Sequence, residues 1–205
     1  WSIKNSDLSG LQDAISKDSQ LIRKKNSSGQ SLLNLACLIA TQDGAIPPQK
    51  GTAEQFSAIE LILNAGAHPS EPDPSGRSPL HVAAISNHFE LAKLLLDAGA
   101  SLDGQLMGAK GGSPLALALF YAKSQMAQFL SNPPTPYNLR TASALGHEIE
   151  PFFEGKNLKP KAANQVDFYR PIPQFPEWTR TCSHQELLDE ALSWTARNDK
   201  LMSMS

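Results

Sequence analysis

Residues 76–103 form the stretch that most restricts how this chain can fold, because they read as two short helices joined by a tight reversal. Ser78 is a favourable N-cap, and Pro79 follows at the first helical position, where its missing N–H costs nothing. Asn87 follows the first helix and tolerates the left-handed backbone of a reversal. The second helix ends before Gly99, a residue type common just beyond a helix C-terminus. Two short helices cannot bury both apolar faces alone, so the pair requires neighbours.

The same pattern recurs along the chain. Asn64-Ala65-Gly66-Ala67 matches Asp97-Ala98-Gly99-Ala100 at an offset of 33 residues. Ser78-Pro79-Leu80 matches Ser113-Pro114-Leu115 at an offset of 35 residues, and a looser match, Ser31-Leu32-Leu33, precedes it by 47 residues. The chain is therefore built from repeats of one helix pair.

A period near 33 with a Ser/Thr-Pro-Leu-His start and a Gly-Ala end resembles the ankyrin repeat, and residues 76–84 with 94–100 are closest to that pattern. The resemblance implies an all-α, ankyrin-type solenoid in which antiparallel helix pairs stack and are joined by hairpin-like loops. It also implies a surface that binds proteins. We expect a positive φ at Gly99 and a large contribution to the core from Leu94, Leu95 and Leu96.

We expect residues 1–205 to form a single solenoid of roughly six repeats. The expected repeats are residues 1–26 (partial), 27–72, 73–107, 108–135, 136–183 and 184–205 (partial). In the fifth repeat, helices are expected over 138–145 and 148–153. An irregular, ordered insertion at 154–183 should follow, because its four prolines block helix while its aromatic residues argue against disorder. A last inner helix is expected over 185–198.

The composition restricts the classes of function. The 205 residues are 40% hydrophobic and 19% charged, with a formal net charge of −2. This near-neutral charge argues against binding to nucleic acid or to an anionic membrane, and no apolar run approaches the roughly 18–20 residues of a membrane span. Cys37 and Cys182 are far apart, which favours a reduced, cytoplasmic setting, although secretion of a parent protein stays open. The chain starts at Trp1 and stops inside an expected helix, so we expect a piece of a longer protein.

No pattern of catalytic or metal-binding residues is found. The five histidines form no H-x-x-x-H spacing, the two cysteines form no C-x-x-C spacing, and there is no phosphate loop. The resemblance implies a loop-stabilising role for His81 and His88. Carboxylates one or two positions apart on a helix point in different directions and do not converge. We therefore expect no enzyme activity, no metal and no cofactor.

Stacked repeats present a concave face of inner helices and a row of loop tips. The positions of ankyrin proteins that often contact partners correspond here to Gln30, Leu38, Arg77, Ile85, Ser86, Lys110, Phe120, Tyr121 and Arg197. Phe120 and Tyr121 together suit an aromatic anchor. The alternative for Phe120 is burial against the proline-rich insertion or the next repeat.

Two classes of function remain. The first is a module that recognises a protein or peptide partner on the concave face. The second is a scaffolding segment of a larger enzyme or effector whose active domain lies outside this chain. Self-association through the partial terminal repeats is a third option. An exposed aromatic patch would favour the first class, whereas complete burial of Phe120 and Tyr121 beneath residues 168–178 would favour the second.

Overall fold

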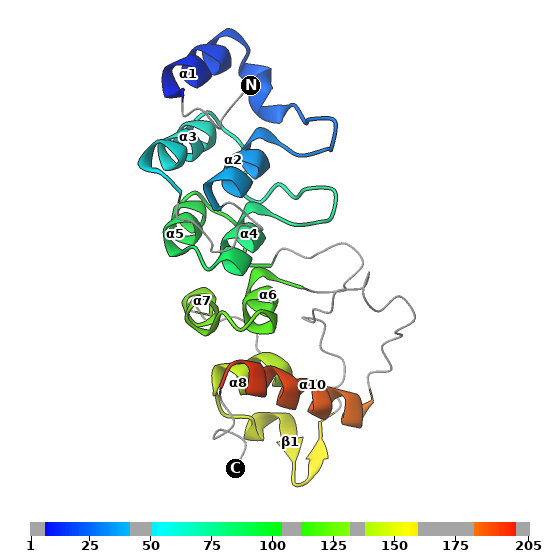
Figure 1. Ribbon diagram of the computed structural model, residues 1–205. Helices are drawn as coiled ribbons and strands as arrows, with labels where there is room; N and C mark the ends of the chain where they lie inside the picture. The colour runs from blue at the N-terminus through cyan, green and yellow to red at the C-terminus, as the bar shows by residue number, and fades with distance from the viewer. Residues whose placement is uncertain (1–6, 42–50, 104–111, 132–137, 160–182, 200–205) are drawn as a thin grey trace. The chain divides into compact units, whose positions relative to one another are not determined.

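The computed structural model describes residues 7–41, 51–103, 112–131, 138–159 and 183–199 (Figure 1). Helices dominate these residues, and one two-stranded sheet accompanies them, so the expected all-α repeat fold is confirmed. The chain divides into two compact units, Trp1–Gly104 and Gln105–Ser205, called here the N-terminal and C-terminal units. The single solenoid over residues 1–205 stays a prediction.

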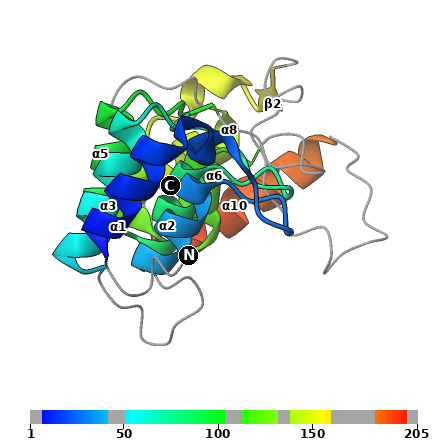
Figure 2. The same cartoon turned by 90° about the horizontal axis from the view of Figure 1, so that it is seen from above.

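The N-terminal unit consists of stacked helix pairs. Its elements are α1 (Leu8–Lys17), η2 (Ser19–Arg23), α2 (Leu32–Thr41), α3 (Ala53–Asn64), α4 (Pro79–Ser86) and α5 (Phe89–Asp97). The inner helices α2 and α4 pack on each other, and each packs on its own outer helix, α3 or α5. Seen from above, α1, α3 and α5 lie on one side of this unit and α2 on the other (Figure 2).

The central helix pair, α4 and α5, has the local structure expected from its sequence. The backbone N–H of Ser78 donates to Nδ1 of His81 at 3.0 Å, which caps the start of α4. Asn87 ends α4 with a φ of 57°, in the left-handed region, and Gly99 follows α5 with a φ of 87°. One expectation is wrong in part. Only the central leucine of the run 94–96 is fully buried, and its two neighbours are half-buried.

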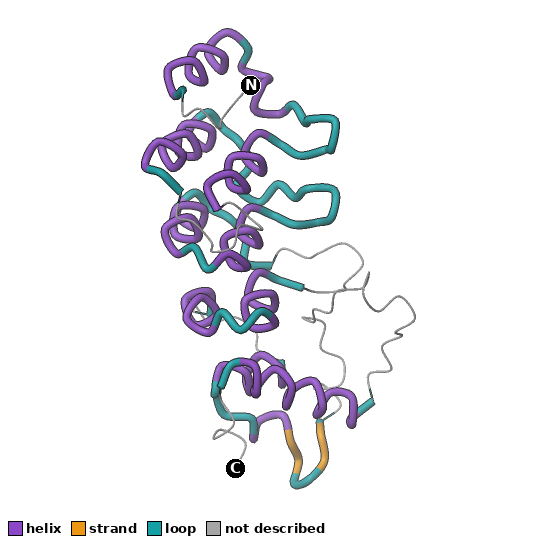
Figure 3. Tube along the Cα trace, in the orientation of Figure 1, coloured by secondary structure: helices purple, strands orange, loops and turns teal. Residues whose placement is uncertain are grey.

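Two hairpin loops of the N-terminal unit have the same internal hydrogen bonds. The N–H of Asn26 donates to the carbonyl oxygen of Gln30 (3.0 Å), and the N–H of Gln30 donates back to Asn26 Oδ1 (2.9 Å). Asp73 and Arg77 form the same reciprocal pair at 2.9 and 3.0 Å. Both loops project from the same side of the unit (Figure 3). This equivalence confirms the offset of 47 residues between these repeats.

The loop carboxylate of Asp73 is expected to make the stability of the N-terminal unit depend on acid pH. Burial raises the pKa of this carboxyl, but hydrogen bonds from Ser75 and from the N–H groups of Arg77 and Ser75, with the Arg77 charge, outweigh burial and hold the pKa below its ordinary value. The folded-state pKa therefore lies below the unfolded one of about 3.9. The stabilisation is present above that unfolded value and is lost as pH falls through the folded value.

We expect the free energy of unfolding of the wild type to fall more steeply below about pH 4 than that of an Asp73→Asn variant. Asparagine should keep the loop intact, because Asn26 makes the same hydrogen bonds in the equivalent loop. Urea denaturation at a series of pH values measures the difference. Parallel pH profiles for the two proteins would contradict the role assigned to Asp73.

Cys37 lies in the middle of α2 with no exposed surface, as expected of a small apolar side chain. Burial raises the pKa of its thiol, so the reactive thiolate is not formed near neutral pH. In a Cys182→Ser variant, we expect a thiol reagent such as Ellman's reagent to label Cys37 only after denaturation. Rapid labelling of the folded variant would show that α2 opens locally.

The C-terminal unit combines a helix pair with a more irregular end. Its elements are α6 (Pro114–Phe120), α7 (Ser124–Leu130), α8 (Leu139–Leu145), η3 (Glu150–Phe152), β1 (Phe153–Glu154), β2 (Asn157–Leu158) and α10 (His184–Arg197). Helix α10 packs along α8 and also contacts α6. The observed bounds of α10 confirm the helix expected over 185–198. Its packing along α8 was not predicted from the sequence.

The prediction of an outer helix over residues 148–153 is wrong. A 3-10 turn and an antiparallel hairpin, in which Phe153 pairs with Leu158, take its place. An α-helix over this range would hold Pro151 in its interior, where proline removes a hydrogen bond and clashes with the preceding turn. The apolar residues of the segment instead pack on a cluster formed by Leu139, Leu158, Leu187 and Ala191.

Candidate functional site

Five of the predicted binding residues lie in the N-terminal unit and are half-buried: Gln30, Leu38, Arg77, Ile85 and Ser86. Gln30 and Arg77 hold equivalent places in the two hairpin loops, and Arg77 Nε also lies 3.4 Å from Asp73 Oδ2. Leu38 and Ile85 hold equivalent places on the inner helices α2 and α4. The structure thus places these side chains in two matching pairs, as the repeat register predicts.

Ser86 differs from these neighbours in its hydrogen bonding. Its hydroxyl donates to the carbonyl oxygen of Val82 at 2.7 Å, one turn earlier in α4. Because this bond already uses the hydroxyl hydrogen, Ser86 can offer a partner only an acceptor and a small apolar surface. Ile85 therefore presents the larger apolar side chain at this end of α4.

In the C-terminal unit, three predicted residues come together as a cluster of Phe120, Tyr121 and Arg197, called here the Phe–Tyr–Arg cluster. The Arg197 guanidinium carbon lies 4.3 Å from the centroid of the Phe120 ring, and its Nη1 donates to the Phe120 carbonyl oxygen at 3.1 Å. The Phe120 and Tyr121 rings meet edge to face, with centroids 5.2 Å apart. Tyr121 is 41% exposed.

Asn198 holds Arg197 in this position. Its Nδ2 donates to the Leu119 carbonyl oxygen at 2.8 Å, and its Oδ1 accepts a hydrogen bond from the Ser124 hydroxyl at 3.1 Å. The side chain is buried, so the end of α10 is fastened to the end of α6. The sequence predicts a separate last repeat for Arg197, and no local pattern in it signals this contact across 77 residues.

Several expectations fall on residues outside the described part of the chain. Lys110 lies outside it. Residues 160–182 of the insertion, whose aromatic side chains are one alternative cover for Phe120, lie outside it as well. Within the described residues, Arg197 lies over the Phe120 ring. Among the described residues, the exposed large hydrophobic ones are Tyr121, with 41% of its surface exposed, and Leu192, with 50%. The described structure therefore leaves an aromatic residue open at the predicted place.

His81 and His88 both act on helix ends. His81 is fully buried and accepts the N–H of Ser78, and His88 Nδ1 accepts the N–H of Leu91 at 3.4 Å at the start of α5. In the part of the chain that the structure describes, no three His, Cys, Asp or Glu side chains gather to hold a metal ion. No helix among the described residues has the length and apolar character needed to cross a membrane.

Comparison with known proteins identifies the repeats. Residues 51–140 match the family model described as ankyrin repeats (3 copies). The chain is 34% identical over 74 residues to the potassium channel GORK of Arabidopsis thaliana, which is 36% of this chain and 9% of that protein. It is 37% identical over 62 residues to the E3 ubiquitin-protein ligase KEG of the same plant, which is 30% of this chain and 4% of the relative.

A third relative is the human neurogenic locus notch homolog protein 4, 39% identical over 67 residues, which is 26% of this chain and 3% of that protein. The chain thus spans less than a tenth of the length of the curated relatives it matches. Ankyrin repeats generally serve as protein–protein interaction modules and are typically not catalytic. The chain therefore carries ankyrin repeats across residues 51–140, which confirms the family resemblance drawn from its sequence.

Proposed function

We propose that this chain is a non-catalytic interaction module that binds a protein or peptide partner through its inner helices and loop tips. The observation that carries the proposal is the Phe–Tyr–Arg cluster. Aromatic and arginine side chains are the residue types that most often dominate binding energy at interfaces. Here one exposed tyrosine stands on a phenylalanine ring that an arginine already orders.

The geometry of the cluster supports a role as an anchor. A side chain held before binding loses less conformational entropy when it contacts a partner. Phe120 and Arg197 are held by the contact of ring and guanidinium and by the hydrogen bond to the Phe120 carbonyl. Tyr121 then offers its exposed face on a support that is already ordered. In the N-terminal unit, Leu38 and Ile85 supply the matching apolar contacts, with Gln30 and Arg77 at the loops.

Affinity capture with the wild-type chain, followed by measurement of the dissociation constant for the captured partner, tests this proposal. We expect Tyr121→Ala and Arg197→Ala each to weaken binding by about 30-fold, which corresponds to the roughly 2 kcal/mol of an interface hot spot. Gln128→Ala, an exposed residue of α7 in the same unit, serves as the matched control. Unchanged affinity in both cluster variants would refute this choice of surface.

A scaffolding role within a larger enzyme or effector is the second candidate. Two of the relatives are a potassium channel and a ubiquitin ligase, and the matched stretch covers only 9% and 4% of them. In those proteins the similar stretch is therefore a small part of a larger functional chain, which favours this second role. In a full-length parent protein, this role predicts altered activity when the chain is deleted, with no partner lost in the Tyr121→Ala variant. The main proposal includes a cytoplasmic location. Self-association is a separate possibility, and light scattering of the purified chain tests it.

A further inference from the structure

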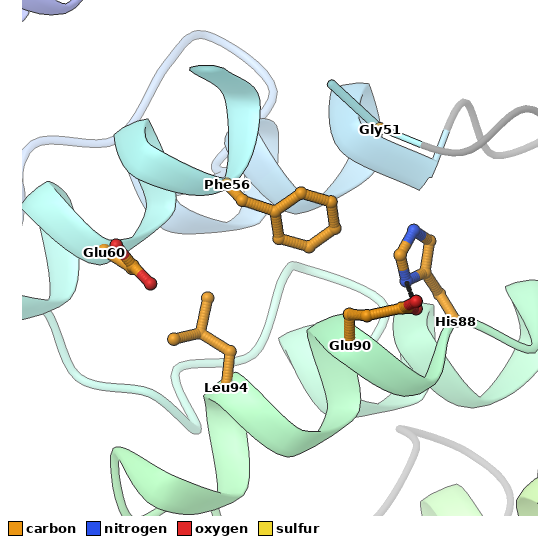
Figure 4. Close-up of a pocket in the computed structure, with 6 residues that line it drawn as sticks. All are labelled: Gly51, Phe56, Glu60, His88, Glu90 and Leu94. Carbon is orange, nitrogen blue, oxygen red and sulfur yellow. Dashed lines mark ion pairs between the residues drawn. The ribbon is translucent and has the colours of Figure 1, made fainter. Parts of the chain in front are cut away.

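A hollow of about 330 Å³ lies between the outer helices α3 and α5 of the N-terminal unit (Figure 4). The described residues that line it are Gly51, Phe56, Glu60, His88, Glu90 and Leu94. The volume lies at the lower end of the range of small-ligand sites, roughly 300–1,000 Å³. None of these residues belongs to the binding surface proposed above.

The apolar part of the hollow is closely packed. The Phe56 ring lies 5.1 Å from the imidazole ring of His88, centroid to centroid, and His88 is buried as the N-cap of α5. The backbone of Gly51 lies close to the Phe56 ring. A Cβ at position 51 would be 3.1 Å from Phe56 Cε2 and 2.6 Å from the carbonyl oxygen of Ala40, so a larger residue would not fit there without a shift. Leu94 points into the same space from α5 (Figure 4). The ring and the leucine therefore form a preformed apolar floor.

The charged part of the hollow is negative. Glu60 lies on α3, and Glu90 lies on α5 with its Oε2 3.4 Å from Nδ1 of His88. Phe56 and Leu94 lie between the two glutamates (Figure 4). Among the described residues that line it, none is a lysine or an arginine. The hollow thus combines an apolar floor with a carboxylate toward either side.

From this arrangement we infer that the hollow binds a basic side chain, arginine or lysine, of a peptide partner. The long aliphatic stem of such a residue would lie on Phe56 and Leu94, as basic side chains do along apolar surfaces. Its charged head would reach Glu60 or Glu90, and a cation near the Phe56 ring gains a further electrostatic attraction. An acidic side chain would meet repulsion from the two carboxylates, and a purely apolar one would gain no attraction from them.

The inference rests on the proposed function, since it names a side chain of a peptide partner, but it uses residues of a different unit. The probes are three blocked tripeptides, Gly-Arg-Gly, Gly-Lys-Gly and Gly-norleucine-Gly, which share an aliphatic stem and differ in their charge. They are titrated into the whole chain while the NMR amide signals of Phe56, His88 and Leu94 are followed. We expect saturable shifts with the two basic peptides and much weaker shifts with norleucine.

The double variant Glu60→Gln with Glu90→Gln should weaken binding of the basic peptides by about fivefold or more. The matched control, Glu54→Gln with Asp97→Asn, removes the same charge from the exposed surface of the same two helices, outside the hollow. It should change the affinity by less than about twofold. Norleucine binding as tight as arginine binding, or equal losses in the two double variants, would overturn the inference. Neither result depends on Tyr121 or Arg197, so the two proposals fail separately.

Discussion

Replacing Glu190 with alanine is expected to lower the free energy of unfolding of the C-terminal unit by about 3–5 kcal/mol. Glu190 lies on α10, and its Oε2 accepts a hydrogen bond from Nε of Arg140 on α8 at 2.7 Å. The two side chains are only 1% (Arg140) and 5% (Glu190) exposed. Removing the carboxylate takes the charge at 2.7 Å away from a buried guanidinium, and this lost charge pairing accounts for most of the expected loss.

The pair itself need not stabilise the fold. A double variant, Arg140→Met with Glu190→Leu, removes both charges and keeps similar volumes, so its stability should return toward that of the wild type. An exposed pair provides the matched control. Lys93→Ala breaks the ion pair with Asp97 on α5, where both side chains are more than 60% exposed, and should cost less than about 1 kcal/mol.

Urea denaturation followed by circular dichroism measures all three variants. A loss below about 1 kcal/mol for Glu190→Ala would show that the buried pair is not the main contact between α8 and α10. A double variant as unstable as the single one would assign the loss to packing of the side-chain stems instead of to charge.

Leu95→Ala is expected to lower the free energy of unfolding of the N-terminal unit by about 2–5 kcal/mol, because it removes a side chain with no exposed surface and leaves a cavity. Leu95 lies in α5 beside Leu91 and Ala92, which are buried on the same stripe. The helix pair α4–α5 is packed through this stripe, so the cavity would open inside the best-formed repeat.

Leu96→Ala is the matched control, since it changes the same residue type at the next position of the same helix. Leu96 is half-buried, so less apolar surface and less cavity volume are lost, and we expect a clearly smaller effect. The two variants are compared by their urea midpoints at equal slope. Equal destabilisation by the two substitutions would contradict the burial pattern of α5.

Leu94, Leu95 and Leu96 show how much of the fold can be predicted from the sequence. The run 94–96 is apolar throughout, so composition cannot separate its members. Only the helical turn and the position of α4 place Leu95 inward and turn its neighbours partly to solvent. The helix expected over 148–153 does not form because Pro151 would stand in its interior, where proline removes a backbone hydrogen bond.

The residues of the candidate binding surface also differ in whether the sequence alone predicts their positions. Gln30 with Arg77, and Leu38 with Ile85, follow from the repeat register alone, and the structure places each pair equivalently. Arg197 is different. Its place over Phe120 depends on the return of α10 to α6, which no local pattern encodes. The hollow at Phe56 and His88 was likewise not predicted, because its lining comes from two repeats.

The sequence by itself determined the repeat, the caps, the reversal at Asn87 and the glycine after α5. Each of these depends on backbone preferences and hydrogen bonds that act within about four residues. Only the tertiary structure decided which leucine of α5 is buried, that Arg140 meets Glu190 inside the C-terminal unit, and that Arg197 covers Phe120. Burial and charge pairing depend on which surfaces meet, and residues 50 or 77 positions apart meet only after the helices have packed.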